Sequence, residues 1–226
     1  PYRQTGKLMV ASDEAESHIL EKYLLQAEAN GVPGVRKISA DEVKELEPNV
    51  CAHSALLIPT SGIVDPTALL RQVYASASNA GVIFMSETEV VNLKLSNGAV
   101  IVDIRYRDGR TDRIRANTVI NAAGVHAVHI ARMVDPKIPI KAALIRGDSY
   151  KYYRNRRAEL FLRTMNVYPI PIVVDSPTGR HLTVGVHLTP TFDMVDGEIR
   201  IGDTVTVGPK LIPVTHFEDY NRTPVL

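Results

Sequence analysis

The sequence predicts a mixed α/β fold of the α+β kind, in which two architectures alternate along the chain. As far as residue 137, segments with a helical spacing of apolar residues alternate with strand patterns, as in a sheet whose strands are joined by helices. From Ile138 onward the segments are extended and separated by turns, which is typical of an antiparallel sheet. A chain of 226 residues is long enough for one large or two small domains with a substantial core.

The first 60 residues predict strands around two helices. GKLMVAS has a strand pattern, and Ser12 at its end is expected to cap a helix that stops at Asn30-Gly31. In SADEVKELEP, Ser39 and Glu42 have the spacing of a capping box, which predicts a second, shorter helix that Pro48 ends. SALLIPTSGIVD follows as an apolar strand that runs into a turn.

A third helix and a group of strands are predicted between residues 61 and 117. Asp65 and Pro66 supply an N-cap and a proline at the first helical position. The buried stripe of this helix is expected to consist of Leu69, Leu70, Val73 and Ala77. VIFMS, EVVNLKLS and AVIVDIRYRDGRTDRIRA have strand patterns, with hairpin turns at Asn97-Gly98 and Asp108-Gly109.

The stretch TVINAAGVHAVHIARMV, residues 118–134, passes from an apolar strand of the buried parallel kind through Ala122-Ala123-Gly124 into a helical pattern. Small residues at such a turn allow close approach either of a neighbouring element or of a ligand phosphate at the helix N-terminus. On the residues alone, the two interpretations carry equal weight. The G-x-G-x-x-G motif is absent, so the chain by itself is not expected to hold a dinucleotide pyrophosphate in the usual way.

Charge and composition exclude several classes of protein. The formal net charge is +1, which gives no reason to expect a nucleic acid partner. The single cysteine, Cys51, excludes an internal disulfide and favours a cytoplasmic location. No apolar segment reaches the roughly 20 residues that a membrane helix needs, and the start lacks the apolar segment of a signal peptide. Because the chain begins at Pro1 within a strand pattern, we expect it to be a piece of a longer protein.

Histidines and arginines supply the candidate functional groups. His126 and His129 could share one helix face, but no acid or cysteine near them completes a metal site, so none is predicted. His187 lies in an apolar strand, where it is either a core histidine with a hydrogen-bond partner or a functional group. LIRGDSYKYYRNRR gathers five cations, which form either a solvated basic face or a rim that binds anions.

Eight segments, taken in order, carry a family resemblance that covers nearly the whole chain. They are RQTGKLMVAS, ELEPNV, IPTSGIVDPTALLRQV, TEVVNL, VINAAGVHA, IRGDSYKY, VYPIP and GVHLTPTFD. In this order they resemble the FAD-dependent oxidoreductases of the D-amino-acid-oxidase (DAO) superfamily. The most similar groups are the L-2-hydroxyglutarate dehydrogenases/oxidases and the FAD-linked glycerol-3-phosphate dehydrogenases. GVHLTPT and RGDSYKY favour the first group, while EPNV and GIVDP are shared with the second.

The resemblance implies a partial FAD-binding, Rossmann-like sheet interleaved with an antiparallel β-sheet substrate domain. It assigns residues 1–60 and 138–202 to the substrate domain, 61–137 to part of the FAD-binding domain, and 203–226 to a truncated return towards it. FAD is the implied cofactor. The residues implied to lie near it are Val90, Ala122, Ala123, Gly124 and His126.

The implied chemistry is hydride transfer to the flavin from a CH–OH group of a small anionic substrate, either glycerol 3-phosphate or a 2-hydroxy acid. His187 is the implied catalytic base for the hydroxyl proton. Arg146, Tyr150 and Thr189 are the implied substrate-binding residues. Two alternatives stay open: an amine or amino-acid oxidase of the same superfamily, and a non-catalytic subunit or interaction module that has lost cofactor binding.

The chain departs from the family pattern at both ends. The glycine motif of the first strand-turn-helix and the glycine-rich turn under the flavin are missing, and Gly202-Asp203-Thr204-Val205 stands where the family usually has GP-N-A. We therefore expect no flavin contacts from Gly202 onward, no retention of FAD by this fragment, and no activity of the fragment alone. A missing domain or second chain is expected to cover exposed apolar surface on the truncated sheet. The electron acceptor, the exact substrate and any membrane association of the longer protein stay open.

Overall fold

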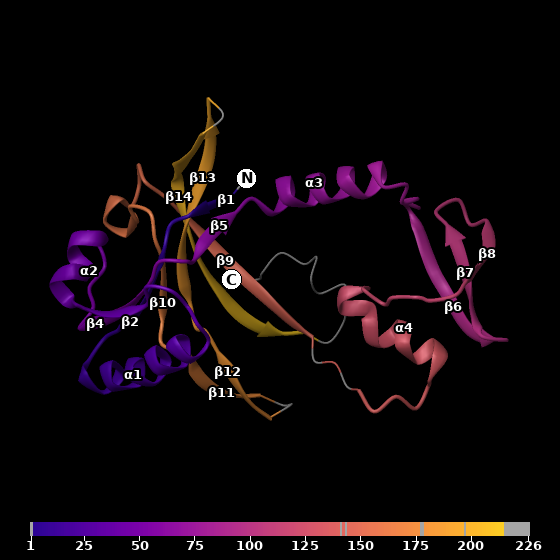
Figure 1. Cartoon of the computed structure of the whole chain (residues 1–226), viewed down its shortest axis with the longest axis horizontal. Coiled ribbons are helices and arrows are strands. Elements are labelled where there is room, and N and C mark those ends of the chain that lie inside the picture. Colours follow the sequence, from indigo (N-terminus) through magenta and orange to yellow (C-terminus); the bar gives the residue numbers. More distant parts are fainter. Residues whose placement is uncertain (1, 141, 143, 177–178, 197, 215–226) are drawn as a thin grey trace. The chain divides into compact units, whose positions relative to one another are not determined.

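The computed structural model describes residues 2–140, 142, 144–176, 179–196 and 198–214 (Figure 1). The chain divides into two compact units, which we call unit 1 (Pro1–Val73 and Gly147–Ile212) and unit 2 (Tyr74–Arg146 and Pro213–Leu226). Each division falls inside a continuous helix or strand. The domain divisions predicted from the sequence, after residues 60, 137 and 202, each lie earlier in the chain than these. Sequence patterns change at turns, whereas a single helix or strand can continue from one unit into the next.

Unit 1 is built on a seven-stranded sheet with the order β3-β4-β2-β10-β13-β14-β9. The strands are β2 (Lys7–Ala11), β3 (Arg36–Ser39), β4 (Ser54–Ile58), β9 (Ile145–Tyr153), β10 (Asn166–Pro169), β13 (His187–Val195) and β14 (Glu198–Pro213). β10 pairs in parallel with β2 and antiparallel with β13, which in turn pairs antiparallel with β14. The extended, antiparallel character predicted from Ile138 onward is therefore confirmed.

Unit 1 also contains two small ribbons. β1 (Tyr2–Gln4) pairs with β5 (Gly62–Val64), and β11 (Ile172–Ser176) pairs with β12 (Gly179–Thr183), both antiparallel. A single turn of 3-10 helix, η2 (Ala158–Leu160), precedes β10.

Local sequence signals fix the helices of unit 1. α1 (Glu14–Ala29) ends at the expected position, but its N-cap is Asp13 rather than Ser12. The Asp13 carboxylate accepts the backbone N–H of Glu16, while the backbone N–H of Ser12 donates to the Glu16 side chain, so the cap lies one residue later than predicted. α2 (Ala40–Leu46) begins with the predicted capping box between Ser39 and Glu42.

The two faces of the large sheet carry different cores. Leu8 and Val10 of β2 lie on the face that packs against α2, which we call the α2 face. Met9 and Ala11 lie on the opposite face, where Leu20 of α1 covers them, and we call it the α1 face. Because side chains alternate along a strand, Lys7 also belongs to the α1 face. The α1 face carries the candidate site described below.

Unit 2 contains a three-stranded antiparallel meander and a short helix. The strands are β6 (Thr88–Ser96), β7 (Ala99–Tyr106) and β8 (Thr111–Ala116). The predicted hairpin turns are confirmed, with positive φ at Asn97, Gly98 and Gly109. η1 (Gly124–His126) leads into α4 (Ala127–Val134), whose Ile130 and Met133 pack against Leu93 and Val102 of the meander.

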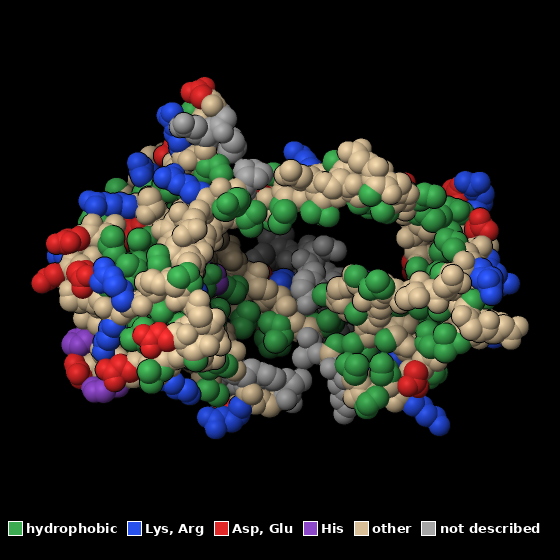
Figure 2. Space-filling model, viewed as in Figure 1, with side chains coloured by type: hydrophobic (Ala, Val, Ile, Leu, Met, Phe, Trp, Pro, Cys, Tyr) green, Lys and Arg blue, Asp and Glu red, His purple; other side chains and the backbone are tan. Residues whose placement is uncertain are grey.

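Three sequence predictions about buried apolar segments are wrong. Residues 82–86 and 118–123 are not strands, because no strand among the described residues pairs with their backbone groups. Ile83 and Ile120 are each 87% exposed. α3 (Pro66–Asn79) is capped by Asp65 as predicted. Its apolar stripe is exposed, however, and Leu70 has an exposed fraction of 69%. Figure 2 shows hydrophobic side chains along this helix at the surface. Helical spacing identifies an apolar face without specifying what covers it.

No described helix is long and apolar enough to cross a bilayer.

Candidate functional site

A row of three side chains crosses the α1 face of unit 1. The imidazole of His187 on β13 stacks on the phenol ring of Tyr168 on β10, with ring centroids 4.1 Å apart and planes inclined by 7°. The ammonium of Lys7 on β2 lies 5.1 Å from the centre of the same Tyr168 ring. Because β10 lies between β2 and β13, Tyr168 separates the two basic groups. Three segments distant in sequence therefore meet in what we call the Lys7–Tyr168–His187 row.

The electrostatics of this row follow from its burial. Burial raises the pKa of the Tyr168 phenol, and a hydrogen bond with the Thr189 side chain partly opposes this rise. Burial also lowers the pKa of the Lys7 ammonium. The half-buried His187 has Nδ1 at 3.3 Å from the carbonyl oxygen of Gly185. When Nδ1 carries the proton and donates it to that carbonyl, Nε2 has a free lone pair and can accept a proton.

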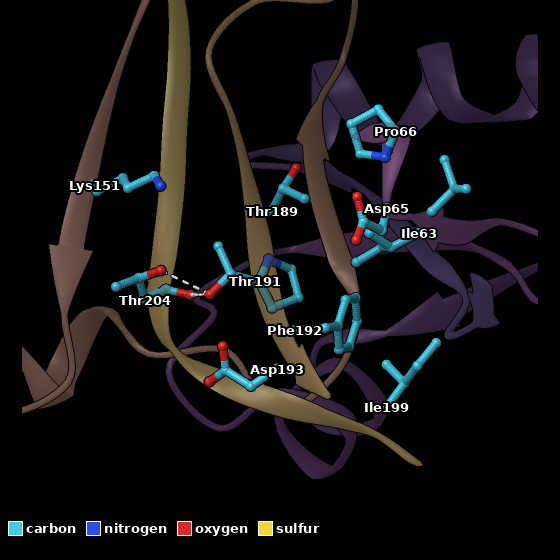
Figure 3. A pocket seen from close by; sticks show the side chains of 12 residues that line it. Ile63, Asp65, Pro66, Lys151, Thr189, Thr191, Phe192, Asp193, Ile199 and Thr204 are labelled. Carbon is cyan, nitrogen blue, oxygen red and sulfur yellow. Dashed lines mark hydrogen bonds between the residues drawn. The ribbon is translucent and has the colours of Figure 1, made fainter. Parts of the chain in front are cut away.

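A pocket of about 470 Å³ adjoins the row in unit 1 and includes Thr189 in its wall (Figure 3). The register between β13 and β14 shifts between Pro190 and Phe192, where three residues of β14, 202–204, face the single Thr191 of β13. The Thr191 hydroxyl donates to the carbonyl oxygen of Thr204 at 2.9 Å and lies 2.7 Å from the Thr204 hydroxyl. Lys151 of β9 adds a cation to the wall (Figure 3). The pocket therefore offers hydroxyl groups, the Lys151 ammonium and the carboxylates of Asp65 and Asp193 to a polar ligand.

The structure does not bring Arg146 and Tyr150 into this pocket. Both lie on β9, where alternation of side chains places them on the face opposite Lys151, which does line the pocket. Their role in substrate binding stays a prediction. Two other cations of the same basic segment make local contacts: Arg154 lies 3.7 Å from the centre of the Phe161 ring, and Arg157 pairs with Glu159. These contacts match the interpretation of the segment as a solvated basic face.

Sequence reasoning missed Lys7 and Tyr168 as site residues, and it included Lys151 only among the five cations of LIRGDSYKYYRNRR. Lys7 and Tyr168 lie in two quoted segments, RQTGKLMVAS and VYPIP, but only the parallel pairing of β2 with β10 makes them neighbours. One signal was available in the first segment. A lysine that alternates with Met9 and Ala11 occupies the same strand face as core residues, so it is a candidate for a partly buried charge.

A second cavity, of about 530 Å³, lies within unit 2. Its wall contains four of the five residues proposed to lie near the cofactor: Val90, Ala122, Ala123 and His126. The fifth, Gly124, begins η1 with φ +55°, a backbone conformation that favours glycine. The turn is held by Asn121, whose Nδ2 donates to the carbonyl oxygen of Ala127 at 2.8 Å and whose Oδ1 accepts the N–H of Ala123.

The composition of this second cavity fits part of a dinucleotide cofactor. Its wall is mainly apolar with a few polar groups, which is typical of small-molecule sites. The methyl side chains of Ala122 and Ala123 leave space for a ligand to approach the backbone. Sequence reasoning did not single out Asn121, although its position two residues before Ala123 is typical of a side chain that supports a turn.

The fold and these two sites define a class of protein. One unit presents titratable side chains on the open part of a mixed sheet, and the other holds a mainly apolar cavity typical of small-molecule sites, an arrangement found in enzymes that bind a substrate and a cofactor on separate units. The chain belongs to the family described as FAD dependent oxidoreductase (DAO), whose sequence model matches residues 1–224. The family resemblance found in the sequence is thereby confirmed.

Three L-2-hydroxyglutarate dehydrogenases illustrate the relatives of the chain. The enzyme from Indibacter alkaliphilus is 29% identical over all of this chain and 51% of its own length. The mitochondrial enzyme from Homo sapiens is 28% identical over all of this chain and 47% of its own length. The enzyme from Escherichia coli K12 is 30% identical over 98% of this chain and 47% of its own length. The chain therefore spans about half the length of the curated relatives it matches.

Solved structures confirm the mixed α/β fold. FAD-bound, dithionite-reduced L-α-glycerophosphate oxidase from Mycoplasma pneumoniae superposes with a TM-score of 0.76 and 22% identity, covering 96% of this chain and 52% of that one. Glycine oxidase from Geobacillus kaustophilus superposes with a TM-score of 0.67 and 18% identity, covering 95% and 49%. At these identities the likeness shows the fold alone.

Proposed function

We propose that this chain supplies the substrate-binding sheet and part of the cofactor-binding unit of an FAD-dependent oxidoreductase that oxidises a small anionic 2-hydroxy acid. The observation that carries the proposal is the placement of His187: its ring is fixed against Tyr168, and its Nδ1 lies against the Gly185 carbonyl. A 2-hydroxy acid is favoured over glycerol 3-phosphate because three relatives at 28–30% identity are named L-2-hydroxyglutarate dehydrogenases, whereas the glycerophosphate oxidase is 22% identical.

The residues of this chain would divide the work between the two units. His187 Nε2 would accept the proton of the substrate hydroxyl, and Thr189 would hydrogen-bond the substrate from the pocket wall. In unit 2, Val90, Ala122 and Ala123 would hold part of the FAD molecule. When bound, FAD would supply the acceptor for the hydride, which leaves the carbon atom that bears this hydroxyl group.

The experiment that tests this proposal is anaerobic reduction of the FAD-loaded protein by candidate substrates. The reduction is monitored through the loss of the visible flavin absorption. L-2-Hydroxyglutarate should bleach the flavin faster than glycerol 3-phosphate or glycine. His187→Asn should slow bleaching by roughly 100-fold, the size of effect typical for loss of a general base, while the flavin content stays the same. The matched control is His53→Asn, since His53 lies in unit 1 but is exposed and pairs with Glu14. Reduction by glycine alone, or an unchanged rate in His187→Asn, would refute the proposal.

A second role, as one component that needs a further segment or chain to complete the cofactor site, is favoured by the exposed apolar residues Ile83 and Ile120 of unit 2. The absorption spectrum of the purified chain after incubation with FAD and gel filtration tests this role. A colourless protein supports the need for a further component. A yellow protein with stoichiometric FAD would show that this chain alone is sufficient for cofactor binding.

A further inference from the structure

Lys7 is a partly buried cation without a counter-ion in the described part of the chain. Its ammonium lies over the Tyr168 ring, and no carboxylate of the described residues forms an ion pair with it. Lys37 on β3 shows the usual arrangement, since its ammonium contacts the Glu21 carboxylate at 3.1 Å and the Ser17 carbonyl at 3.2 Å. A charge removed from water is normally compensated by a partner of opposite charge. Among the described residues no carboxylate plays this part for Lys7, so its ammonium can receive an anionic group of a ligand.

The surroundings of Lys7 indicate a polar ligand rather than an apolar one. Asn166 lies directly opposite Lys7 in the register of β2 and β10. It is 7% exposed, and its Oδ1 accepts no hydrogen bond from the described residues. Buried amide oxygens almost always accept a hydrogen bond, so this atom also calls for a partner. Asn166 Oδ1 is an acceptor, as is a carboxylate, so this oxygen indicates polar surroundings, whereas the preference for an anion comes from the Lys7 ammonium alone.

The distance between Lys7 and His187 suits a short molecule that places a hydroxyl group at His187 and an anionic group at Lys7. The two residues lie on β2 and β13, which are two strand spacings apart, or about 10 Å. A short-chain dicarboxylate, together with its hydrogen bonds, can span this distance. A small monocarboxylate whose hydroxyl lies at His187 cannot also place a carboxylate at Lys7.

We propose that Lys7 determines substrate specificity by binding the distal carboxylate of a dicarboxylic 2-hydroxy acid whose reacting hydroxyl lies at His187. This inference rests on the proposed function and goes further by assigning the second anionic group of the substrate to one residue. Lys151, in the neighbouring pocket, is the competing cation. The test must therefore separate Lys7 from Lys151.

The test is calorimetric binding of glutarate and butyrate to the full chain, which needs neither FAD nor turnover. Glutarate should bind more tightly than butyrate, and Lys7→Met should weaken glutarate binding by roughly tenfold or more, as expected for loss of one charged hydrogen bond. Butyrate binding should change little. Lys94→Met, on the exposed part of β6, is the matched charge control and should keep glutarate affinity within about twofold of the parent chain. Lys151→Met tests the competing cation in the pocket wall and should weaken glutarate binding less than Lys7→Met does.

Lys7→Arg keeps the charge and should retain most of the glutarate affinity, which separates loss of charge from loss of folding. Equal affinity for glutarate and butyrate, absence of glutarate binding, or weakening by Lys151→Met instead of Lys7→Met would each overturn the inference. Different results would refute the proposed function and the role of Lys7. If glutarate binds through Lys7 but the FAD-loaded protein oxidises no 2-hydroxy acid, only the function is wrong. If lactate and L-2-hydroxyglutarate are oxidised equally well, only the role of Lys7 is wrong.

Discussion

The imidazole of His187 lies nearly parallel to the phenol ring of Tyr168, with 4.1 Å between the ring centroids. This contact fixes one face of the imidazole, and the hydrogen bond between Nδ1 and the Gly185 carbonyl fixes its rotation. An imidazole held in this way loses little conformational entropy when it adopts a reactive orientation. Under the proposed function, Tyr168 would therefore be a positioning residue, which acts through His187 rather than on a substrate atom.

Tyr168→Ala should lower kcat of the FAD-loaded protein by roughly 100-fold, the loss that a small misplacement of a catalytic group can cause. Tyr168→Phe keeps the stacked ring and should retain most of kcat. The structural readout is the NMR signal of the His187 ring proton, which is shifted by the ring current of Tyr168. The shift should persist in Tyr168→Phe and disappear in Tyr168→Ala. Equal losses of kcat in both variants would show that the hydroxyl, not the stacking, matters.

Glu47 connects the ELEPNV segment to the strand that carries Tyr168. Its carboxylate is completely buried and accepts the backbone N–H groups of Arg163, Thr164 and Met165 at 2.5, 2.8 and 2.7 Å. These residues lead directly into β10. A buried carboxylate with three donors explains why an acidic residue occupies a core position at the end of α2.

Glu47→Gln should lower the free energy of unfolding by about 2 kcal/mol, because the amide replaces one acceptor oxygen with a donor that faces a backbone N–H. Urea denaturation followed by far-UV circular dichroism measures the change. Glu45→Gln is the matched control, since the Glu45 side chain is exposed on the same helix. A loss of stability no larger than that of Glu45→Gln would contradict the structural role of Glu47.

The parts of the fold that the sequence predicts correctly depend on local interactions. The capping box of α2 and the turn at Asn97-Gly98 are set by residues within a few positions of each other. The row on the α1 face depends on the pairing of β2 with β10, which no local pattern specifies. Residues 118–123 have the composition of a buried strand, but composition cannot provide a neighbouring strand to pair with. The same limit explains the exposed stripe of α3.

In unit 2, Asp103 of β7 accepts hydrogen bonds from both neighbouring strands. Arg113 Nε of β8 donates at 2.7 Å and Asn92 Nδ2 of β6 at 3.0 Å. The hydrogen bond from Arg113 is the largest cause of a lowered pKa of the Asp103 carboxyl. The pKa of Asp103 is lower in the folded protein than in the unfolded chain. The contribution of Asp103 to the free energy of unfolding is therefore fully present when the pH is above the unfolded-state pKa, and it is lost as the pH falls through the folded-state pKa.

Arg113→Gln should therefore raise the pKa of Asp103 towards its ordinary value, measured from the NMR titration of its carboxyl carbon. The matched control is Arg115→Gln, because Arg115 lies two residues along the same strand and faces Ile101 rather than Asp103. Arg113→Gln, but not Arg115→Gln, should also reduce the loss of unit 2 stability that occurs as the pH is lowered. An Asp103 titration that is the same in both variants would show that the ion pair does not persist in solution.

Ile120 and Ile104 are isoleucines of unit 2 in opposite environments: Ile120 is 87% exposed, whereas Ile104 is 3% exposed in the core of the meander. Ile120→Ser should change the free energy of unfolding by no more than about 0.5 kcal/mol, as is usual for surface substitutions, and should reduce binding of an apolar dye. Ile104→Ser should cost several kcal/mol, because it leaves a cavity and buries a hydroxyl. If Ile120→Ser is instead as destabilising as Ile104→Ser, residues 118–123 are buried in solution, and the apolar surface that a further segment would cover does not exist.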